Sequence, residues 1–235
     1  MVAVGREQAA RIEDAIDATT PSVHVVPCGV PLDVFQPCDR AGRPSDGPVL
    51  LQVGRLAPEK GVLETLEAFG RMAEEVPGAV LRFVGDGPLG SELEARIRRG
   101  GLQDRVFLLG VVDGAEVASC MRDADVLIQN SIPTADSIEG FGVTVAEGGR
   151  TGLPIVATRV GGLLDQVEHR RNGLLVDPGD VAALAEAMSA LASDATLRRT
   201  LGVAASEMAI RFDAKRMAAR LSALLQDAIR RGVDA

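Results

Sequence analysis

The chain has 235 residues, of which 46% are hydrophobic, and its 25 basic and 33 acidic side chains give a net charge of -8. This length and apolar content suffice for one complete α/β domain with additional segments. An acidic chain without a long run of Lys and Arg lacks the positive surface that non-specific nucleic-acid binding requires, so we expect no nucleic-acid partner.

The cysteines and the hydropathy exclude further classes of protein. Cys28, Cys38 and Cys120 form neither a disulfide framework nor a Cys-x-x-Cys site with histidine partners, so we expect reduced thiols and no metal. The first residues do not combine a basic start with a long apolar core, and no apolar run reaches the roughly 18 residues of a membrane helix. We therefore expect a cytoplasmic protein with neither a signal peptide nor a membrane span.

The first part of the chain contains elements that are too few for a core of their own. Residues 2–4 and 23–26 are predicted strands, and residues 7–18 are a predicted helix between them. Residues 37–48 are rich in Pro, Gly, Asp and Arg, which indicates a linker.

From residue 49 onward, short apolar runs alternate with longer amphipathic ones, which predicts repeated βα units and a parallel sheet. Six strands are expected, at residues 49–53, 80–84, 106–109, 126–129, 155–157 and 174–176. Helices are expected at residues 62–75, 91–99, 115–121, 142–151, 163–167 and 181–191. The pattern fits a doubly wound α/β sheet, whose ligands bind at the carboxyl ends of the strands.

The last segment, residues 213–230, is predicted to be an amphipathic helix. Its apolar side chains recur at near-helical spacing, at Met217, Leu221, Leu224, Leu225 and Ala228. Such an apolar stripe needs a surface to pack against.

Two carboxylates frame a glycine-rich turn in the sequence Glu139-Gly-Phe-Gly-Val-Thr-Val-Ala-Glu147. The glycines favour a turn, which places Glu139 in the loop after the fourth strand and Glu147 in the second turn of the next helix. The N–H groups at that helix start, with the Thr144 hydroxyl, are suited to hold a phosphate, and the glutamates to bind hydroxyls on either side of it. The alternative is a capping carboxylate followed by a solvated glutamate, and these residues alone do not decide between the two.

A second cluster, Gly54-Arg55-Leu-Ala-Pro-Glu-Lys60-Gly61, leaves the first strand of the sheet and enters a helix. Arg55 offers a planar fork for bidentate phosphate binding and Lys60 a flexible point charge, so the pair is suited to neutralise a diphosphate. Two solvated loop cations are the alternative. The functional interpretation gains weight because both clusters belong to the same, carboxyl edge of the sheet.

Two other motifs are set aside on their context. The sequence Gly85-Asp-Gly-Pro-Leu-Gly90 matches a dinucleotide-binding pattern, but its aspartate would crowd a pyrophosphate, and the next strand ends in Gly110 where an acid is expected. The sequence Asp123-Ala-Asp125 resembles a metal-binding motif of some sugar transferases. It precedes its strand, so it is expected at the opposite edge of the sheet.

Five motifs, taken together and in order, resemble the retaining GT-B glycosyltransferases of the group 1, or family 4, type. They are Val53-Gly-Arg-Leu-Ala-Pro-Glu-Lys-Gly61, Phe83-Val-Gly-Asp-Gly-Pro88, Glu139-Gly-Phe-Gly142 through Glu147, Gly152-Leu-Pro-Ile-Val-Ala157 and Gly161-Gly162. The likeness runs from about residue 2 to the C-terminus and corresponds to the second half of that family's proteins.

The resemblance implies a division of the chain. Family members have two Rossmann-like domains, the first for the acceptor and the second for the nucleotide-sugar. By this likeness, the segments are a remnant of the acceptor domain (1–28), a crossover linker (29–47), the nucleotide-sugar-binding domain (48–212) and a C-terminal helix (213–235). The acceptor domain itself is nearly absent, so the resemblance implies a missing domain or a partner chain, through which the protein could reach a membrane surface.

The resemblance also implies roles for individual residues. Arg55 and Lys60 would bind the donor diphosphate, and Glu139 the transferred sugar, so these three are the expected catalytic residues. The expected donor-binding residues are Gly54, Gly140, Phe141, Gly142, Val143, Thr144 and Glu147, the last through the ribose hydroxyls and the Gly-Phe-Gly turn through its backbone. The family keeps the anomeric configuration, works without a metal or other cofactor, and is thought to use front-face attack by the acceptor.

Three features depart from the family pattern. The loop at residues 130–139 is longer than usual, and Asp165 stands where the family often has Glu. Gly148 and Gly149 replace an alanine-rich stretch, which costs the helix about 1 kcal/mol each relative to Ala.

We therefore expect a donor domain that binds a UDP-, GDP- or ADP-sugar for retaining, metal-independent transfer to an acceptor. The alternative is a nucleotide-sugar binding module, or one subunit of a split transferase that is inactive alone. A structural or interaction protein on a degenerate version of the fold ranks last, because it would leave the glutamates and cations without a task.

Overall fold

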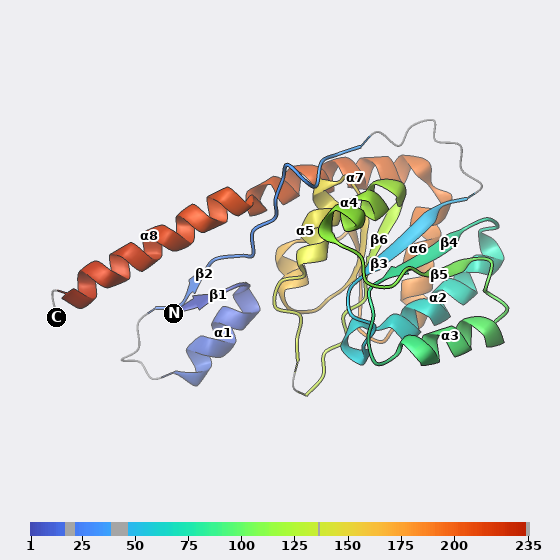
Figure 1. Cartoon of the computed structure of the whole chain (residues 1–235), viewed down its shortest axis with the longest axis horizontal. Helices are drawn as coiled ribbons and strands as arrows, with labels where there is room; N and C mark the ends of the chain where they lie inside the picture. Colours follow the sequence, from blue (N-terminus) through green and yellow to red (C-terminus); the bar gives the residue numbers. More distant parts are fainter. Residues whose placement is uncertain (17–21, 39–46, 136, 234–235) are drawn as a thin grey trace.

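The computed structural model describes residues 1–16, 22–38, 47–135 and 137–233 (Figure 1). Its main sheet has six parallel strands: β3 (Val49–Val53), β4 (Val80–Val84), β5 (Val106–Leu108), β6 (Val126–Gln129), β7 (Ile155–Thr158) and β8 (Gly173–Val176). All six predicted strands are confirmed, with ends that shift by at most one residue. The predicted doubly wound α/β fold is therefore confirmed.

The strand order in the main sheet is β5-β4-β3-β6-β7-β8. The chain builds outward from β3 through β4 to β5, then returns to place β6 on the other side of β3. The connections after β3 and after β6 therefore turn to opposite faces of the sheet. The switch point between them, at the carboxyl edge, is the crevice where ligands bind in folds of this kind.

Helices cover both faces of the main sheet (Figure 1). One core cluster joins the sheet to α2 (Val62–Glu75), α3 (Gly90–Arg99) and α6 (Val181–Ser193). The other joins it to α4 (Gly114–Asp123) and α5 (Val143–Arg150). The period of two along β3 explains this division, since Leu50 belongs to the first cluster and Leu51 to the second.

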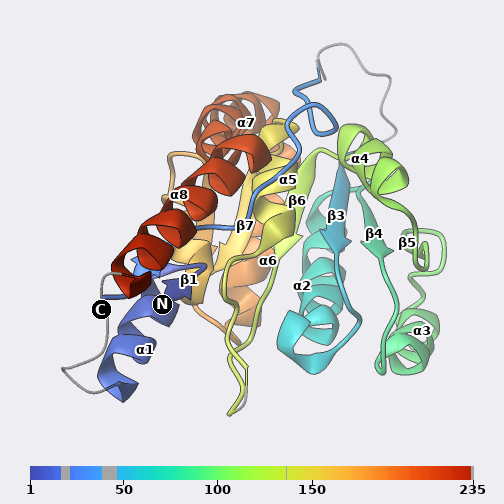
Figure 2. The ribbon, with the colours of Figure 1, turned by 60° about the vertical axis from the view of Figure 1, so that its left-hand side comes forward.

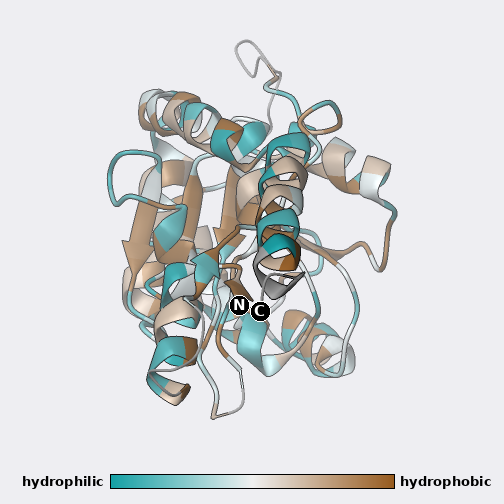
Figure 3. Cartoon of the chain, turned by 90° about the vertical axis from the view of Figure 1, so that its left-hand side faces the viewer, coloured by the Kyte–Doolittle hydropathy of each residue, from teal (hydrophilic) through white to brown (hydrophobic). Residues whose placement is uncertain are grey.

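The hydropathy of the elements matches their burial (Figure 3). Every residue of β6 and of β7 is buried, as expected for strands that are covered on both faces. The helices carry hydrophilic and hydrophobic residues side by side, because each buries only one face.

One predicted helix is wrong, and one helix of the structure was not predicted. Residues 163–167 were expected to be a helix, but a 3-10 segment, η2 (Gly161–Asp165), occupies this region. Its glycines lie against the loop that contains Glu139, since a Cβ on Gly162 would come within 2.2 Å of the Gly140 carbonyl oxygen. This close contact with the loop shapes a short turn in place of a regular helix. The helix α7 (Ala195–Ala209) was not predicted.

The N-terminal residues form a small unit beside the main domain (Figure 2). Strands β1 (Val2–Ala3) and β2 (His24–Val25) pair in parallel, and α1 (Arg6–Ala15) connects to them. The predicted helix extended to residue 18, but α1 ends at Ala15, because Ile16 has an extended backbone. Residues 17 and 18 lie outside the described residues, as does most of the predicted linker at residues 37–48. The unit has too few buried residues for a core, as the sequence indicated.

The C-terminal helix α8 (Ala214–Val233) confirms the predicted amphipathic helix and runs from the main domain past the N-terminal unit (Figures 1 and 2). It begins beside the crossover segment, because the Val30 N–H donates to the Phe212 carbonyl at 2.8 Å and the Ala214 N–H to the Val30 carbonyl at 3.0 Å. The two chain segments that leave the main domain are thus tied together.

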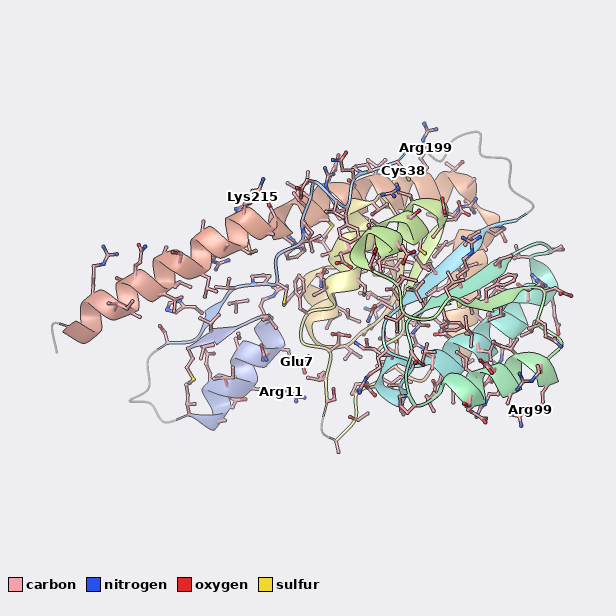
Figure 4. The ribbon with its side chains drawn as sticks, viewed as in Figure 1. Glu7, Arg11, Cys38, Arg99, Arg199 and Lys215 are labelled. Atoms are coloured by element: carbon pink, nitrogen blue, oxygen red, sulfur yellow. The ribbon has the colours of Figure 1, made fainter. Side chains whose placement is uncertain are left out.

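Charged side chains lie mainly on the solvent faces of the helices (Figure 4). Arg11 contacts Glu7 at 3.4 Å on α1, and Arg99 contacts Glu92 at 3.2 Å on α3. Solvent screens ion pairs of this exposed kind, so they contribute little to stability. The pairs that bear on function lie at the crevice instead.

Candidate functional site

The loops that follow β3 and β6 are bonded to each other at the carboxyl edge of the sheet. The Ile132 N–H donates to the Glu59 carbonyl at 3.0 Å, and the Asn130 side-chain amide donates to the Gly61 carbonyl at 2.9 Å. Gly61 has φ 55°, and a Cβ there would lie 2.4 Å from the Asn130 carbonyl oxygen. Only glycine permits this approach.

Lys60 and Glu139 form an ion pair across these two loops. The Lys60 Nζ lies 2.6 Å from the Glu139 Oε2, and the two side chains are only 28% and 12% exposed. Partial burial reduces solvent screening, so this pair is held more firmly than the exposed pairs on the helices. The Gln52 amide also donates to the Lys60 carbonyl at 2.6 Å, which fixes the backbone of that loop.

Two further donors contact the same oxygen of Glu139. The Ser131 hydroxyl donates to Oε2 at 3.0 Å and the Gln129 Nε2 at 3.2 Å. Among the residues that the structure describes, no donor contacts the other oxygen, Oε1. The sequence did not single out Gln129 or Ser131, although a polar residue at the carboxyl end of an apolar strand was the available signal.

Arg55 lies at the outer side of the same crevice. Its guanidinium donates to Glu59, and this hydrogen bond lowers the pKa of the Glu59 carboxyl. The Arg55 side chain is 65% exposed, so it remains accessible to a ligand. Gly54, just before it, has φ 146° and no heavy atom within 4 Å of where a Cβ would be, which leaves open space beside the strand end.

The helix α5 begins at this edge, as the sequence predicted. Gly142 precedes it with φ 79°, a conformation that favours glycine. The N–H groups of Val143 and Thr144 fall in the first turn, where a helix has no internal acceptors. The carbonyls of Phe141 and Gly142 are held by the buried Gln166 amide, at 3.2 Å for Gly142.

Two residues of this turn are committed to contacts within the protein. The Phe141 ring is buried against Phe212, with centroids 5.1 Å apart in an edge-to-face arrangement, so only its backbone faces the crevice. The Thr144 hydroxyl donates to the Gln129 Oε1 at 2.7 Å, so its proton already has an acceptor. The expected phosphate donors of this turn are therefore its backbone N–H groups.

Glu147 lies one helical turn after Val143, on the same side of α5. Burial raises the pKa of its carboxyl from the ordinary 4.5 to about 7. A carboxyl group with this pKa changes its charge near neutral pH, which is unusual for a surface glutamate.

A cavity of about 200 Å³ lies in the crevice. It is lined by Arg55, Glu59, Lys60, Ile132, Ser137, Ile138 and Glu139. The structure therefore brings all three residues that were expected to be catalytic to one cavity. The Gly140–Gly142 turn follows Glu139 directly.

The motifs that were set aside have structural roles. A Cβ on Gly85 would lie 2.0 Å from the Gly54 carbonyl oxygen, so this glycine lets the loops after β3 and β4 approach each other. The Asp125 carboxylate accepts from the Val49 N–H at 2.8 Å, at the amino edge of the sheet. Asp125 is thus remote from the crevice, as expected.

The described ranges contain no group of three or more His, Cys, Asp or Glu side chains placed to hold a metal ion. Within the same ranges, the helices lack the combination of length and apolarity that crossing a bilayer requires.

The family "Glycosyl transferases group 1" matches residues 39–208. A D-inositol 3-phosphate glycosyltransferase of Xylanimonas cellulosilytica is 35% identical over 225 residues, which cover 90% of this chain and 53% of that protein. The chain thus spans about half the length of this relative.

Solved structures of glycosyltransferases share the fold. A sucrose-phosphate synthase from Thermosynechococcus elongatus has a TM-score of 0.83 and 29% identity, over 97% of this chain and 58% of that one. Anabaena HepE, solved in complex with UDP, has a TM-score of 0.82 and 25% identity, over 96% of this chain and 63% of that one.

The doubly wound sheet, together with these likenesses, is that of one Rossmann-like half of a GT-B glycosyltransferase. The chain belongs to the group 1 glycosyltransferase family.

Proposed function

We propose that this chain is the donor-binding half of a glycosyltransferase that uses a UDP-, GDP- or ADP-sugar. The observation that carries this proposal is the Lys60–Glu139 pair, which places a cation suited to a diphosphate beside a carboxylate suited to sugar hydroxyls in one cavity. HepE, similar in fold, was solved with UDP, which supports a nucleotide diphosphate as the ligand.

Each of the expected site residues has a role in this proposal. Arg55 and Lys60 neutralise the diphosphate as it leaves, and the N–H groups at the start of α5 add the positive end of the helix dipole. Glu139 accepts a hydroxyl of the transferred sugar, and Glu147 accepts the ribose hydroxyls. Two protein cations at the diphosphate support metal-independent chemistry.

We propose retention of the anomeric configuration, with the acceptor attacking from the face that the diphosphate leaves. The acceptor itself would be bound by a further domain or chain. Anomer analysis of the product by NMR, with the transferase supplied with that domain, tests this part, and an inverted product would contradict it.

Titration calorimetry with UDP, GDP and ADP tests the central proposal. At least one should bind, and Arg55→Ala combined with Lys60→Ala should weaken it by about tenfold or more for each lost charge-assisted contact. Arg71→Ala is the matched control, because Arg71 pairs with Glu67 on the exposed face of α2, and it should leave the affinity unchanged. Binding of no nucleotide, or unchanged binding by the double variant, would refute the proposal.

The second candidate is a nucleotide-sugar binding module or one subunit of a split transferase, inactive alone. It is favoured by the exposed apolar side chains of Leu221, Leu225 and Ile229, which are four residues apart along α8 and thus share one face. Binding of the donor without transfer, until another polypeptide is added, would support this candidate over the first.

A cytoplasmic location completes the proposal. Cys28 and Cys120 are free thiols, which suits a reducing compartment. Attachment to a membrane would then depend on the partner domain, and cell fractionation tests both statements.

A further inference from the structure

Gln129 is a buried amide at the centre of the site. It is the last residue of β6, where the other residues are apolar, and it is 5% exposed. A buried amide is costly unless its polar atoms are paired, so its partners indicate why it is there. They lie on two different elements, the loop after β6 and the helix α5.

The chemistry of these partners fixes the orientation of the Gln129 amide. An ionised carboxylate can only accept, so the amino side of Gln129 faces Glu139, at 3.2 Å, and also Ser131, at 3.1 Å. The carbonyl side then faces Thr144, whose hydroxyl donates to it at 2.7 Å. The Ser131 hydroxyl in turn donates a hydrogen bond to Glu139 at 3.0 Å.

All these hydrogen bonds run toward one oxygen of Glu139. With Lys60, Oε2 accepts from three donors on three different residues, which restrain rotation of the carboxylate. Ser131 is itself anchored, because the Thr158 hydroxyl donates to its carbonyl at 2.7 Å. The second oxygen, Oε1, is the acceptor left to a ligand in the cavity that Glu139 lines.

We propose that Gln129 is a positioning residue, which fixes the Glu139 carboxylate so that Oε1 receives a hydroxyl of the donor's sugar. This inference rests on the proposed function, since it assigns an atom of the same site. Gln129 also holds the Thr144 hydroxyl in place. It acts through other residues, so its removal should affect the sugar more than the nucleotide.

Paired titrations test the proposal on the full chain: UDP with UDP-glucose, GDP with GDP-mannose, and ADP with ADP-glucose. The measured quantity is the ratio of the Kd of the diphosphate to that of its sugar conjugate. Gln129→Met, which keeps the length but removes the amide, should lower this ratio about 5- to 10-fold, as expected for the loss of a buried hydrogen bond. The Kd of the diphosphate alone should change by less than about twofold, which also shows that the variant is folded.

Gln129→Glu distinguishes a positioning role from a purely structural one, because only a positioning role makes the ratio of the two Kd values depend on pH. Two carboxyl groups this close share a proton at low pH and repel each other at high pH. The ratio should therefore be low at pH 8 and recover near pH 5.5, where the introduced carboxyl can donate to Glu139. The other charged groups of the site, Arg55, Glu59, Lys60 and Glu147, are unchanged in this variant. The wild-type ratio at the same two pH values is therefore the control, above all for Glu147, whose pKa of about 7 lies between them.

The measurements distinguish failure of the proposed function from failure of this inference. A chain that binds no nucleotide overturns the proposed function and this inference together. A chain that binds nucleotide overturns the inference alone if its sugar brings no gain in affinity, if Gln129→Met keeps the wild-type ratio, or if Gln129→Glu shows no recovery at low pH.

Discussion

At the scale of single residues, Glu147 combines an expected role in donor binding with an unusual acidity. Desolvation on α5 is the cause, since burial disfavours the charged carboxylate and raises its pKa to about 7. The folded protein therefore holds this proton up to about pH 7, whereas the unfolded chain releases it near the ordinary value of 4.5. The protonated group is thus compatible with folding, and its ionisation opposes folding as the pH rises.

The variant Glu147→Gln should remove this pH dependence. Its Tm should match that of the wild type near pH 4.5, exceed it progressively up to about pH 7, and then keep a constant lead. For a chain of this size, each kcal/mol corresponds to about 2–4 °C in Tm. Thermal unfolding followed by circular dichroism measures the difference.

Glu147→Leu is the control. It also removes the titrating carboxyl, but it replaces it with an apolar side chain, whereas Gln resembles the protonated acid. The difference in Tm between the two variants should be independent of pH. A wild-type curve parallel to both variants between pH 4.5 and 7 would contradict the raised pKa.

At the scale of elements, the glycines of α5 adapt the helix to its neighbours. A Cβ on Gly148 would lie 2.6 Å from the Leu127 Cδ2 in β6, which is too close for an unchanged core. A Cβ on Gly149 would meet the Ala205 carbonyl oxygen of α7 at 3.4 Å, an ordinary contact. The sequence indicated only the cost of glycine to the helix, whereas packing gives the reason at Gly148.

The two alanine substitutions should therefore have opposite signs. Gly148→Ala should destabilise the fold by about 1–3 kcal/mol, because it overpacks the contact with the fully buried Leu127. Gly149→Ala should be neutral or stabilising by up to about 1 kcal/mol, through helix propensity. Urea unfolding of both variants measures the difference, and equal effects would contradict this account of the packing.

At the scale of the whole molecule, Asp165 connects the N-terminal unit to the main domain. Its carboxylate accepts from the Arg6 N–H at 2.8 Å and pairs with the Arg6 guanidinium. Gly5 fits beside the Gly140 carbonyl, since a Cβ on Gly5 would lie 2.6 Å from that oxygen. The position of α1 is thus set by the same turn that follows Glu139.

Asp165→Ala should release the N-terminal unit without unfolding the main sheet. Amide hydrogen exchange in α1 should accelerate by about tenfold or more, since a hydrogen bond with a charged partner is lost, while exchange in β3 and β6 stays unchanged. Glu7→Ala removes only the exposed pair with Arg11 and should leave exchange in α1 within about threefold of the wild type. Equal protection in Asp165→Ala and wild type would show that the unit is held by other contacts.

The long predicted elements were correct because their signals are local. The short apolar runs of the strands and the spacing of apolar residues along α2 and α6 can be read from neighbouring residues. The weaker signals failed. Helix α7 buries small residues such as Ala205 and Gly202, which give little contrast along the sequence, and η2 is shaped by the loop that it touches.

The sequence by itself determined the positions along the chain of the six sheet strands and of most helices. It also placed Arg55, Lys60 and Glu139 at the carboxyl edge of the sheet, because these follow from local hydropathy patterns and chain direction. The tertiary structure decided which side chains meet. Lys60 and Glu139 are 79 positions apart, and Arg6 and Asp165 are 159 positions apart. Contacts over such separations depend on the strand order, and on which atoms remain unpaired once the core has closed, so no local pattern encodes them.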